Sequence, residues 1–430
     1  MTAAMVAHIA AAVHSVDWPD VLIFALTYFG LALGDIPYTR LDRSSIALLG
    51  AVAVLLFHRL SLHGAIDGID FPTLILLISM MVISAQLRLA GFYDWVVRRI
   101  VAAACQPWRL LAGLIAFSAL LSAVFANDVI CLIFTPVLCV ALRRARRDPV
   151  PYLMALATAS NIGSAATLIG NPQNMLIGET AHLNFAVYFV TVAPLIIFCL
   201  LLDYAAIALI YRSRLFMDVE PLAAVASADE HYHQPVMQWR LVFKTLVVVG
   251  VLLAAMLAGS LIDVNRPVAA MAAAGVILVS RKTRPSDLFA MVDWNLILLF
   301  VGLFIVIADV ESHHLLTSAL HYLATMGLSL KSHLPLTGVT LVLSNLVSNV
   351  PAVLLIKPAL PLGATHTWYL LAVVSTLAGN LTLLGSIANL IVAQQALPFS
   401  VKLRFREFLK AGVPLTLLCV GVTVLYFRIV

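Results

Sequence analysis

The chain has 430 residues, of which 62% are hydrophobic and only 11% are charged. A soluble protein has about 25% charged residues, so this chain has too few charges to cover a surface of its size, and most of its exterior is expected to face lipid. Its net charge of +5 is better explained by membrane topology than by a nucleic-acid surface, which excludes an ordinary soluble protein and predicts no nucleic-acid partner.

Apolar segments bounded by Pro, Gly and charged residues predict the membrane spans. Residues 1–12 carry no Lys or Arg before their apolar stretch, so no signal peptide is predicted and the first span is expected to stay. The first half has predicted spans at 19–36, 44–60, 71–90 and 184–211, a paired segment at 109–126 and 128–142, and an interrupted segment at 152–181. The second half has predicted spans at 239–259, 265–280, 294–310 and 411–429, a paired segment at 333–349 and 351–362, and an interrupted segment at 367–397.

Each paired segment is interpreted as a re-entrant hairpin. Its arms of about 12–18 residues are short for a bilayer span, which needs roughly 20. The two hairpins are expected to turn at Asn127 and Asn349. The sequence therefore predicts an all-α membrane protein with about ten transmembrane helices and two re-entrant hairpins.

The positive charges predict the orientation of these spans. With the N-terminus outside, 21 of the 26 Lys and Arg residues fall in loops on the inner side. The other five are Arg59, Arg266, Lys331, Lys357 and Arg428. The pattern obeys the positive-inside rule, but it does not distinguish a re-entrant hairpin from two full crossings, because both return the chain to the same side.

The two halves resemble each other at nearly constant offsets. An offset of 222 residues pairs Ser122 with Ser344, Asn127 with Asn349, and Pro136 with Pro358. An offset of 215 pairs 167–170 with 382–385 and Asn174 with Asn389, and a four-residue gap then aligns Asn161 with Asn380. Such polar matches are informative because these residues are scarce in this chain.

Each half has an odd number of predicted crossings, so the second half enters the membrane upside down. This is the inverted-repeat architecture of secondary transporters. The predicted division is a first repeat at 1–212, a linker at 213–238 and a second repeat at 239–430. The polar linker is interpreted as a solvated cytoplasmic connector; a histidine-rich sensor is the alternative.

The polar residues of the chain cluster at the predicted breaks. Irregular backbone inside a membrane persists only where protein or a water-filled cavity covers it, and helix N-termini at such breaks attract anions. The sequence therefore predicts one substrate and ion site near the midplane. Its residues are Asn127 and Asp128; Asn161, Thr167, Gly170, Asn171 and Asn174; Ser348 and Asn349; and Asn380, Thr382, Gly385, Ser386 and Asn389. The alternative is that these residues only allow tight helix packing.

Asp128 is the ionisable residue at a predicted hairpin turn. Within a bilayer such a group is a functional candidate by default, and it could take and release a proton. It could also cap the following helix arm; the two roles are compatible. Asp203 is expected to pair with a polar neighbour deep in its span, and Asp309 to lie at the outer edge.

The chain lacks the motifs of catalysis. It has no nucleophile–base pair, no metal-ligand spacing and no Walker loop, so it is predicted not to be an enzyme and to need no cofactor and no metal. A channel is a further alternative, but no ring of charges or symmetric filter is visible.

Two blocks carry a resemblance to a known family. Phe125 to Ile177 contains A-N-D-V, T-P, A-S-N-I-G-S and I-G-N-P-Q-N, and Ser348 to Asn389 ends in A-G-N-L-T-L-L-G-S-x-x-N. These blocks resemble the ion transporter superfamily, closest to its arsenite/antimonite permease and citrate-transporter-like branch, which is related to divalent anion:sodium symporters. The resemblance implies a homodimer in a bacterial inner (plasma) membrane, with a scaffold part, a mobile transport part and an elevator movement.

The resemblance also implies a secondary active transporter. The sodium-coupled branch carries Ser-Asn-Thr at both hairpin turns, where this chain has 126–128 as Ala-Asn-Asp and 348–350 as Ser-Asn-Val. The missing hydroxyls favour a proton over sodium as the coupling ion. With no obvious Arg for a carboxylate, the expected substrate is a small inorganic oxyanion or metalloid such as arsenite or antimonite. A dicarboxylate, citrate or sulfate carrier is the alternative, and a separate soluble ATPase partner stays open.

Overall fold

The computed structural model describes residues 18–33, 41–57, 59–103, 106–215, 237–260, 264–313 and 329–429, and every regular element in these ranges is a helix. Six of the described helices are long and apolar enough to cross a membrane. They are α5 (Phe71–Leu89), α7 (Pro107–Val124), α11 (Phe185–Ile210), α14 (Trp239–Leu257), α17 (Trp294–Ser312) and α23 (Phe405–Ile429).

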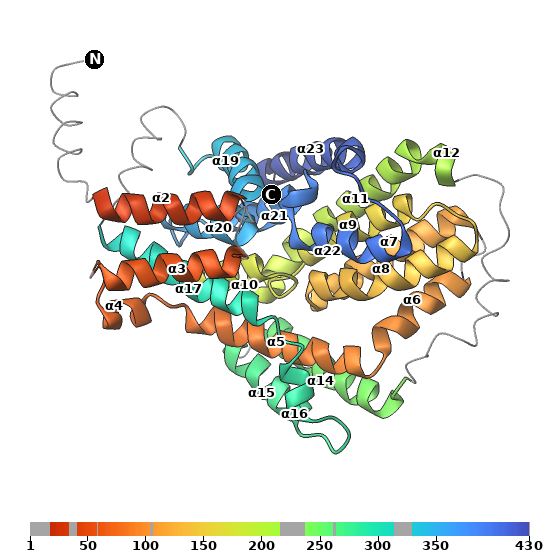
Figure 1. The fold of residues 1–430 in the computed structure, drawn as a ribbon, viewed down its shortest axis with the longest axis horizontal. Helices are drawn as coiled ribbons and strands as arrows, with labels where there is room; N and C mark the ends of the chain where they lie inside the picture. The colour runs from red at the N-terminus through yellow and green to blue at the C-terminus, as the bar shows by residue number, and fades with distance from the viewer. Residues whose placement is uncertain are drawn as a thin grey trace, which may run out of the picture.

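Shorter helices lie among these six in both halves of the chain (Figure 1). The first half adds α2 (Trp18–Leu33), α3 (Arg43–Leu56), α4 (Leu62–Asp67), α6 (Phe92–Ala103), α8 (Asn127–Arg144), α9 (Val150–Ser164), α10 (Pro172–Thr180) and α12 (Arg212–Leu215). The second half adds α15 (Arg266–Leu278), α16 (Pro285–Phe289), α19 (His333–Val347), α20 (Asn349–Ile356), α21 (Thr365–Ala378) and α22 (Ile387–Ala396), with 3-10 turns η1 to η4 at 258–260, 357–359, 383–385 and 397–399.

The helices form two groups. The frame group consists of α2 to α5 and α14 to α17, in which α3 packs on α2 and α17, and α5 packs on α14 and α15. The site group consists of α7 to α11 and α19 to α23, in which α9 packs on α7, α8 and α11, and α21 packs on α19 and α23. Helix α6 contacts α5 on one side and α7 and α8 on the other. Each half of the chain therefore contributes helices to both groups.

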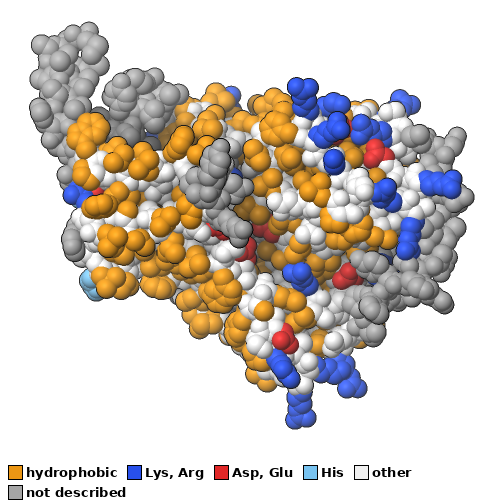
Figure 2. All heavy atoms as spheres, in the orientation of Figure 1, with side chains coloured by type: hydrophobic (Ala, Val, Ile, Leu, Met, Phe, Trp, Pro, Cys, Tyr) orange, Lys and Arg blue, Asp and Glu red, His pale blue; other side chains and the backbone are white. Residues whose placement is uncertain are grey.

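Much of the surface is apolar, as the composition requires. Side chains such as Leu209, Phe243 and Val190 are at least 70% exposed on helices of spanning length. Figure 2 shows hydrophobic side chains over much of this face, while Lys and Arg gather toward the end where α6 and α12 lie and at the tip beside α16. These basic ends are the ones that the sequence places on the inner side.

The predicted elements correspond closely to the observed helices. Both hairpins and both interrupted segments are present, and most described helices begin and end within a few residues of the predicted bounds. The largest differences are at α23, which begins at Phe405 instead of residue 411, and at α20, which ends at Ile356 instead of residue 362. One prediction was too short: both arms of the first hairpin are 18 residues long, so length alone does not separate this hairpin from two crossings. The second hairpin has arms of 15 and 8 residues, too short for a span.

Helix α6 was missed because its charges made it look like a loop. Asp94, Arg98 and Arg99 lie on one side, while Val97 and Ile100 are buried on the other, which is the pattern of an amphipathic helix. The N-terminal residues 1–17 and most of the predicted linker, residues 216–236, lie outside the described residues. The domain boundaries stay a prediction.

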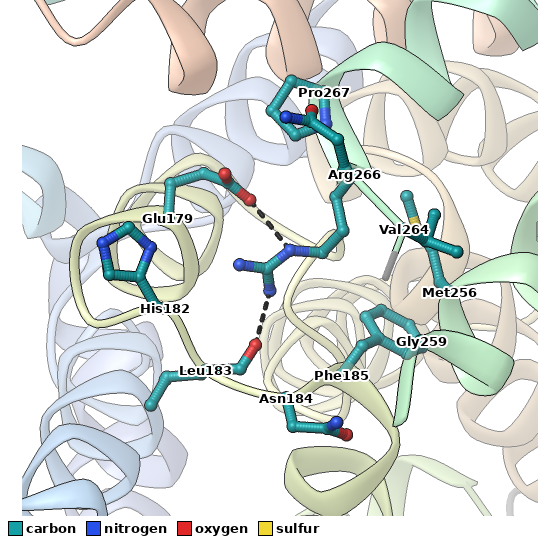
Figure 3. A pocket seen from close by; sticks show the side chains of 11 residues that line it. Glu179, His182, Leu183, Asn184, Phe185, Met256, Gly259, Val264, Arg266 and Pro267 are labelled. Atoms are coloured by element: carbon teal, nitrogen blue, oxygen red, sulfur yellow. Dashed lines mark hydrogen bonds and ion pairs between the residues drawn. The ribbon is translucent and has the colours of Figure 1, made fainter. Parts of the chain in front are cut away.

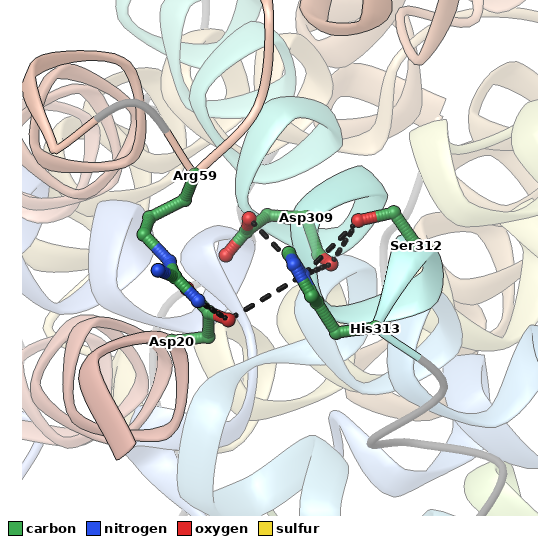
Figure 4. A network of polar contacts seen from close by, with 5 residues as sticks. All are labelled: Asp20, Arg59, Asp309, Ser312 and His313. Carbon is green, nitrogen blue, oxygen red and sulfur yellow. Dashed lines mark hydrogen bonds and ion pairs between the residues drawn. The ribbon is translucent and has the colours of Figure 1, made fainter. Parts of the chain in front are cut away.

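A buried ionic cluster joins three helices of the frame group (Figure 4). The Arg59 guanidinium forms two hydrogen bonds to the Asp20 carboxylate, one of them at 2.7 Å, and the Asp20 side chain is fully buried. The His313 Nδ1 atom lies 3.4 Å from Asp20 Oδ2 and 3.7 Å from Asp309 Oδ1. Asp309, expected near the outer edge, lies in the last turn of α17 and is only 1% exposed. The cluster fixes the ends of α2, α3 and α17 to one another.

Replacing Arg59 by glutamine is expected to destabilise the fold. The substitution leaves the buried Asp20 carboxylate without its guanidinium partner, and breaking a buried pair from one side costs about 3–5 kcal/mol. Thermal unfolding of the purified protein in detergent measures this. Lys410→Gln is the control, because Lys410 is 62% exposed in its pair with Glu407 and such a pair contributes at most about 1 kcal/mol. Equal effects of the two substitutions would contradict the structural role of the cluster.

Candidate substrate site

Two helices of the site group are interrupted where the sequence predicted it. Helix α9 ends at Ser164 and α10 begins at Pro172, and α21 ends at Ala378 and α22 begins at Ile387. In the first break the Asn171 side chain caps α10 by accepting a hydrogen bond from the backbone N–H of Asn174 at 2.9 Å. Two helix N-termini, those of α10 and α22, therefore point into irregular backbone, which favours negative charge there.

Both breaks hold a glycine in close contact with backbone, and the contact is tighter in the first. A Cβ atom at Gly170 would lie 2.2 Å from the carbonyl oxygen of Ser164, and one at Gly385 would lie 3.0 Å from the carbonyl oxygen of Gly379. Ser164 and Gly379 are themselves related by the 215-residue offset. The two breaks therefore share the same backbone crossing.

The two breaks also share their hydrogen bonds. The Asn174 amide donates to the carbonyl oxygen of Thr167 at 3.1 Å, and the Asn389 amide donates to that of Thr382 at 3.1 Å. The Thr167 hydroxyl donates to the carbonyl of Ala123 on the first hairpin, and the Thr382 hydroxyl donates to Asn345 Oδ1 on the second at 3.0 Å. Residues 123 and 345 are separated by the 222-residue offset. Each break is thus tied to the hairpin of its own half in the same way.

Asn161 joins the two halves. Its Nδ2 atom donates to Asn380 Oδ1 at 2.8 Å and to Asn389 Oδ1 at 3.1 Å. Its Oδ1 atom accepts from Asn127 Nδ2 at 2.9 Å and from Ser386 Oγ at 3.0 Å. All five side chains are at most 7% exposed. We call these five residues the Asn161 cluster.

A second polar cluster lies around Thr376 on α21. Asn171 Nδ2 donates to Thr376 Oγ1 at 3.1 Å and to Ser164 Oγ at 3.0 Å, and Gln173 Nε2 approaches Thr376 Oγ1 at 3.3 Å. Thr376 Oγ1 in turn lies 3.4 Å from Asn174 Oδ1. These contacts connect the first break to the helix that precedes the second break.

Besides Asn127, the hairpin turns carry three predicted site residues that belong to neither cluster. Asn349 lies beside the second break, with its Nδ2 atom 3.3 Å from a Cβ built at Gly379, and its buried Oδ1 atom has no hydrogen-bond partner. Ser348 has φ 76°, ψ 163°, a backbone conformation that stores strain and is typical of functional sites. Asp128 is half-buried at the start of α8, in the first turn of that helix.

The structure thus brings most of the predicted site residues into one region. Asn127, Asn161, Asn380, Ser386 and Asn389 form one hydrogen-bonded cluster, whereas Asn171 and Asn174 belong to the second. Thr167, Gly170, Thr382 and Gly385 shape the breaks, and Asp128, Ser348 and Asn349 lie at the turns. Whether they bind substrate stays a prediction.

Three polar residues of this region were missed by the sequence reasoning. Thr376 and Asn345 lie in apolar helices just before a predicted break and a predicted hairpin turn, and the repeat pairs Asn345 with Ala123, so symmetry gave no signal for it. Thr158, whose carbonyl accepts a hydrogen bond from Asn380 Nδ2 at 3.1 Å, is also on an apolar helix. Its spacing of three residues from Asn161 could have placed it on the same helix face.

The two clusters contain no charged side chain. The side chains that bond to Asn161 are amides and one hydroxyl, and those of the second cluster are likewise amides and hydroxyls. Amides and hydroxyls both donate and accept. Such a set can bind an uncharged polyhydroxide, or an anion with the help of the helix N-termini.

A cavity of about 270 Å³ lies away from these clusters, between the ends of α10 and α11 in the site group and α14 and α15 in the frame group (Figure 3). Arg266 of α15 reaches across it to the site group. Its guanidinium pairs with Glu179 at 3.0 Å and donates to the carbonyls of Leu183 at 2.9 Å and Gly178 at 2.7 Å. This contact holds the two helix groups together at one end.

Curated relatives of the chain are membrane proteins and transporters. The 46 kDa membrane protein of Mycobacterium leprae is 27% identical, covering 94% of this chain and 97% of that protein. The silicon efflux transporter LSI3 of rice (Oryza sativa subsp. japonica) is 30% identical, with 84% and 87% covered. The putative transporter arsB of Dictyostelium discoideum is 25% identical, with 93% and 89% covered.

Two solved structures share the fold. The YdaH transporter of Alcanivorax borkumensis superposes with a TM-score of 0.56 at 15% identity, with 96% of each chain covered. MtrF of Neisseria gonorrhoeae superposes with a TM-score of 0.59 at 12% identity, with 95% and 94% covered. The all-helical fold is therefore that of a membrane transporter, as the sequence predicted.

The family comparison covers most of the chain. The model described as citrate transporter, CitMHS, matches residues 28–378, which include the first hairpin, the first break and the helix before the second break. The family consists of transporters and not enzymes, which confirms the prediction that the chain is not an enzyme. The chain belongs to the citrate transporter (CitMHS) family of membrane transporters.

Proposed function

We propose that this protein is a proton-coupled secondary transporter of a small metalloid hydroxide or inorganic oxyanion, with arsenite or antimonite as the type. The observation that carries the proposal is the uncharged, hydrogen-bonding Asn161 cluster where two broken helices meet. In the structure the amides of the cluster hydrogen-bond to one another. A solute with several hydroxyl groups can replace these bonds with its own hydrogen bonds to the same amides. A citrate or dicarboxylate site would instead call for a guanidinium to pair with a carboxylate.

The relatives support the same class of solute. One is called a silicon efflux transporter and another a putative arsB transporter, and the hydroxides of silicon and arsenic are both small and uncharged near neutral pH. The second candidate is citrate or a dicarboxylate, favoured by the description of the family model. Sulfate and a sodium-coupled variant belong to this second candidate.

The proposed movement is a displacement of the site group along the frame group, in a homodimer in the bacterial inner membrane. The division of the helices into two groups supports this movement of one group along the other. The contacts of Arg266 with Glu179 and with two carbonyl oxygens would have to break during such a displacement.

The experiment is a transport assay with the purified protein in liposomes. Arsenite, silicic acid, sulfate and citrate are offered as separate solutes, each with an imposed proton gradient, an imposed sodium gradient or none. We expect saturable, proton-driven flux of arsenite or silicic acid with counterflow. Citrate flux alone would favour the second candidate, and non-saturating flux without counterflow would indicate a channel and contradict the proposal.

Asp128→Asn is expected to abolish proton-driven accumulation in this assay. The residue stands at a hairpin turn, half-buried, where a carboxyl can exchange a proton with water. Solute-driven counterflow at equal pH on both sides is expected to persist, because asparagine keeps the shape of the side chain. If the variant still concentrates the solute under a proton gradient, Asp128 is not the coupling residue.

A further inference from the structure

One buried carboxyl of the site group is unused by the proposed site. Asp203 lies on α11, in the helix with the highest mean hydropathy of the six spanning candidates, 2.7, and its side chain is fully buried. Its Oδ1 atom is 2.8 Å from Thr158 Oγ1, and its Oδ2 atom has no hydrogen-bond partner. Burying a carboxylate without a cation is expensive, so its presence calls for an explanation.

The hydrogen bonds around Thr158 fit a protonated carboxyl. The Thr158 hydroxyl has one proton, and its oxygen lies 2.9 Å from the carbonyl oxygen of Met154, the usual acceptor one turn earlier in a helix. If that proton goes to Met154, the proton between Thr158 and Asp203 must come from Asp203. The carboxyl then donates through Oδ1–H, and Oδ2 is the carbonyl oxygen of a neutral acid, which tolerates burial better than a carboxylate does.

The surroundings supply no charge to stabilise the ionised form. Among the described residues, no Lys, Arg or His forms an ion pair with Asp203. The titratable group that faces the carboxyl from α23 is the thiol of Cys419, which approaches the backbone of Cys199 one turn earlier on α11. From α9 the facing group is the Thr158 hydroxyl, which does not titrate.

Thr158 connects this carboxyl to the substrate site. The carbonyl oxygen of Thr158 accepts from Asn380 Nδ2 at 3.1 Å, and Asn380 Oδ1 accepts from Asn161 at 2.8 Å. Asp203 is thus separated from the Asn161 cluster by a single residue. A negative charge on Asp203 would oppose an anion in the cluster, and ionisation would turn the Thr158 hydroxyl away from Met154 toward the carboxylate.

We propose that Asp203 is a proton-binding site linked to the Asn161 cluster through Thr158 and Asn380. On release the Oδ1–H bond breaks and the proton passes to water that enters the site; on uptake the reverse occurs. Because linkage is reciprocal, binding of an anion at the cluster favours the protonated carboxyl, and protonation favours the anion. The proposal rests on the proposed function for its role in transport, but the proton itself is measurable without transport.

The test is infrared difference spectroscopy of the full-length protein in lipid, titrated with pH. A protonated buried carboxyl gives a C=O stretching band that carboxylates and amides lack. We expect this band in the wild type and in Asp128→Asn, its loss in Asp203→Asn, and its disappearance as pH rises. An unchanged band in Asp203→Asn, or a band that persists to the highest pH at which the protein stays folded, would overturn the proposal.

Separate variants test the link between Asp203 and the Asn161 cluster. Asn380→Ala is expected to move the midpoint of the band's pH titration, whereas Asn184→Ala, which only removes the cap of α11, leaves it in place. An identical midpoint in Asn380→Ala and the wild type would show that the cluster and the carboxyl are independent. In the transport assay, sulfate affinity is expected to fall by about 5- to 150-fold as pH rises through the titration of the carboxyl, the range of typical coupling. Arsenite affinity is expected to change little. Failure of all transport with an intact band titration would overturn the proposed function alone.

Discussion

Replacing Gly170 by alanine is expected to destabilise the protein by about 3 kcal/mol or more, and to abolish transport. The new Cβ atom would lie 2.2 Å from the carbonyl oxygen of Ser164 and 2.9 Å from its carbonyl carbon. These are backbone atoms at the end of α9, so no side chain can rotate away. Forced overpacking in a filled core costs about 1–3 kcal/mol and occasionally more, and a collision with backbone belongs at the upper end. Unfolding in denaturing detergent and uptake by liposomes measure the two effects.

Two other glycines make this prediction specific. At Gly385 the nearest atom to a new Cβ is the side-chain Asn345 Oδ1, at 2.7 Å, which can move at the cost of its hydrogen bond to Thr382, about 1 kcal/mol. At Gly250 in α14 nothing lies within 4 Å, and alanine there is expected to stabilise the helix by about 0.5–1 kcal/mol. The expected order of stability is therefore Gly250→Ala above wild type, then Gly385→Ala, then Gly170→Ala. A Gly170→Ala protein as stable as the wild type would mean that the first break is not built as described.

The fold could be predicted from the sequence because lipid makes the signal simple. In a membrane each backbone group must be satisfied within its own helix, so apolar segments and their interruptions give the helices directly. Gly170 and Pro172 marked the first break, and Gly379 and Gly385 the second, and the helices end there. The amphipathic helix α6 escaped because charged residues interrupt its apolar ones, so it contains no continuous apolar segment.

The site could be predicted only as far as symmetry and rare residues allowed. Asn161, Asn380 and Asn389 were found because asparagine is unusual in apolar helices and because the offsets paired them. The partners of these residues depend on how α9 and α21 pack, which no spacing reveals. Thr376, Asn345 and Thr158 resemble ordinary helix residues in the sequence, and only the packing of one helix on another shows that they bond to residues of the breaks.

Asp203 illustrates the same limit for charge. The sequence showed an ionisable residue in an apolar span and an expected polar neighbour, and the structure confirms that neighbour as Thr158. The sequence could not show that the carbonyl oxygen of Thr158 also accepts a hydrogen bond from Asn380. The connection between a buried carboxyl and the substrate site is a property of helix packing and not of the local sequence.

Replacing Asn161 by alanine is expected to reduce transport by about 100-fold or more. The substitution removes four hydrogen bonds at once and leaves the amides of Asn127, Asn380 and Asn389 without this partner in a region at most 7% exposed. An unsatisfied buried group costs about 1–3 kcal/mol, and each 1.4 kcal/mol is about tenfold in an equilibrium constant, so two such groups are enough for the expected loss. The initial rate of arsenite uptake at several concentrations measures it.

Asn161→Asp separates the two sides of the cluster. Aspartate keeps the acceptor for Asn127 and Ser386 but cannot donate to Asn380 and Asn389 unless it is protonated, so its activity is expected to recover as pH falls, while that of Asn161→Ala does not. Asn184→Ala is the matched control, because Asn184 caps α11 at a distance from the cluster and its loss costs about 1 kcal/mol of stability without touching the cluster. If Asn161→Ala transports as fast as Asn184→Ala, the cluster is a packing device and the solute binds elsewhere. Recovery of Asn161→Asp at low pH would instead show that transport requires hydrogen-bond donation from residue 161 to Asn380 and Asn389.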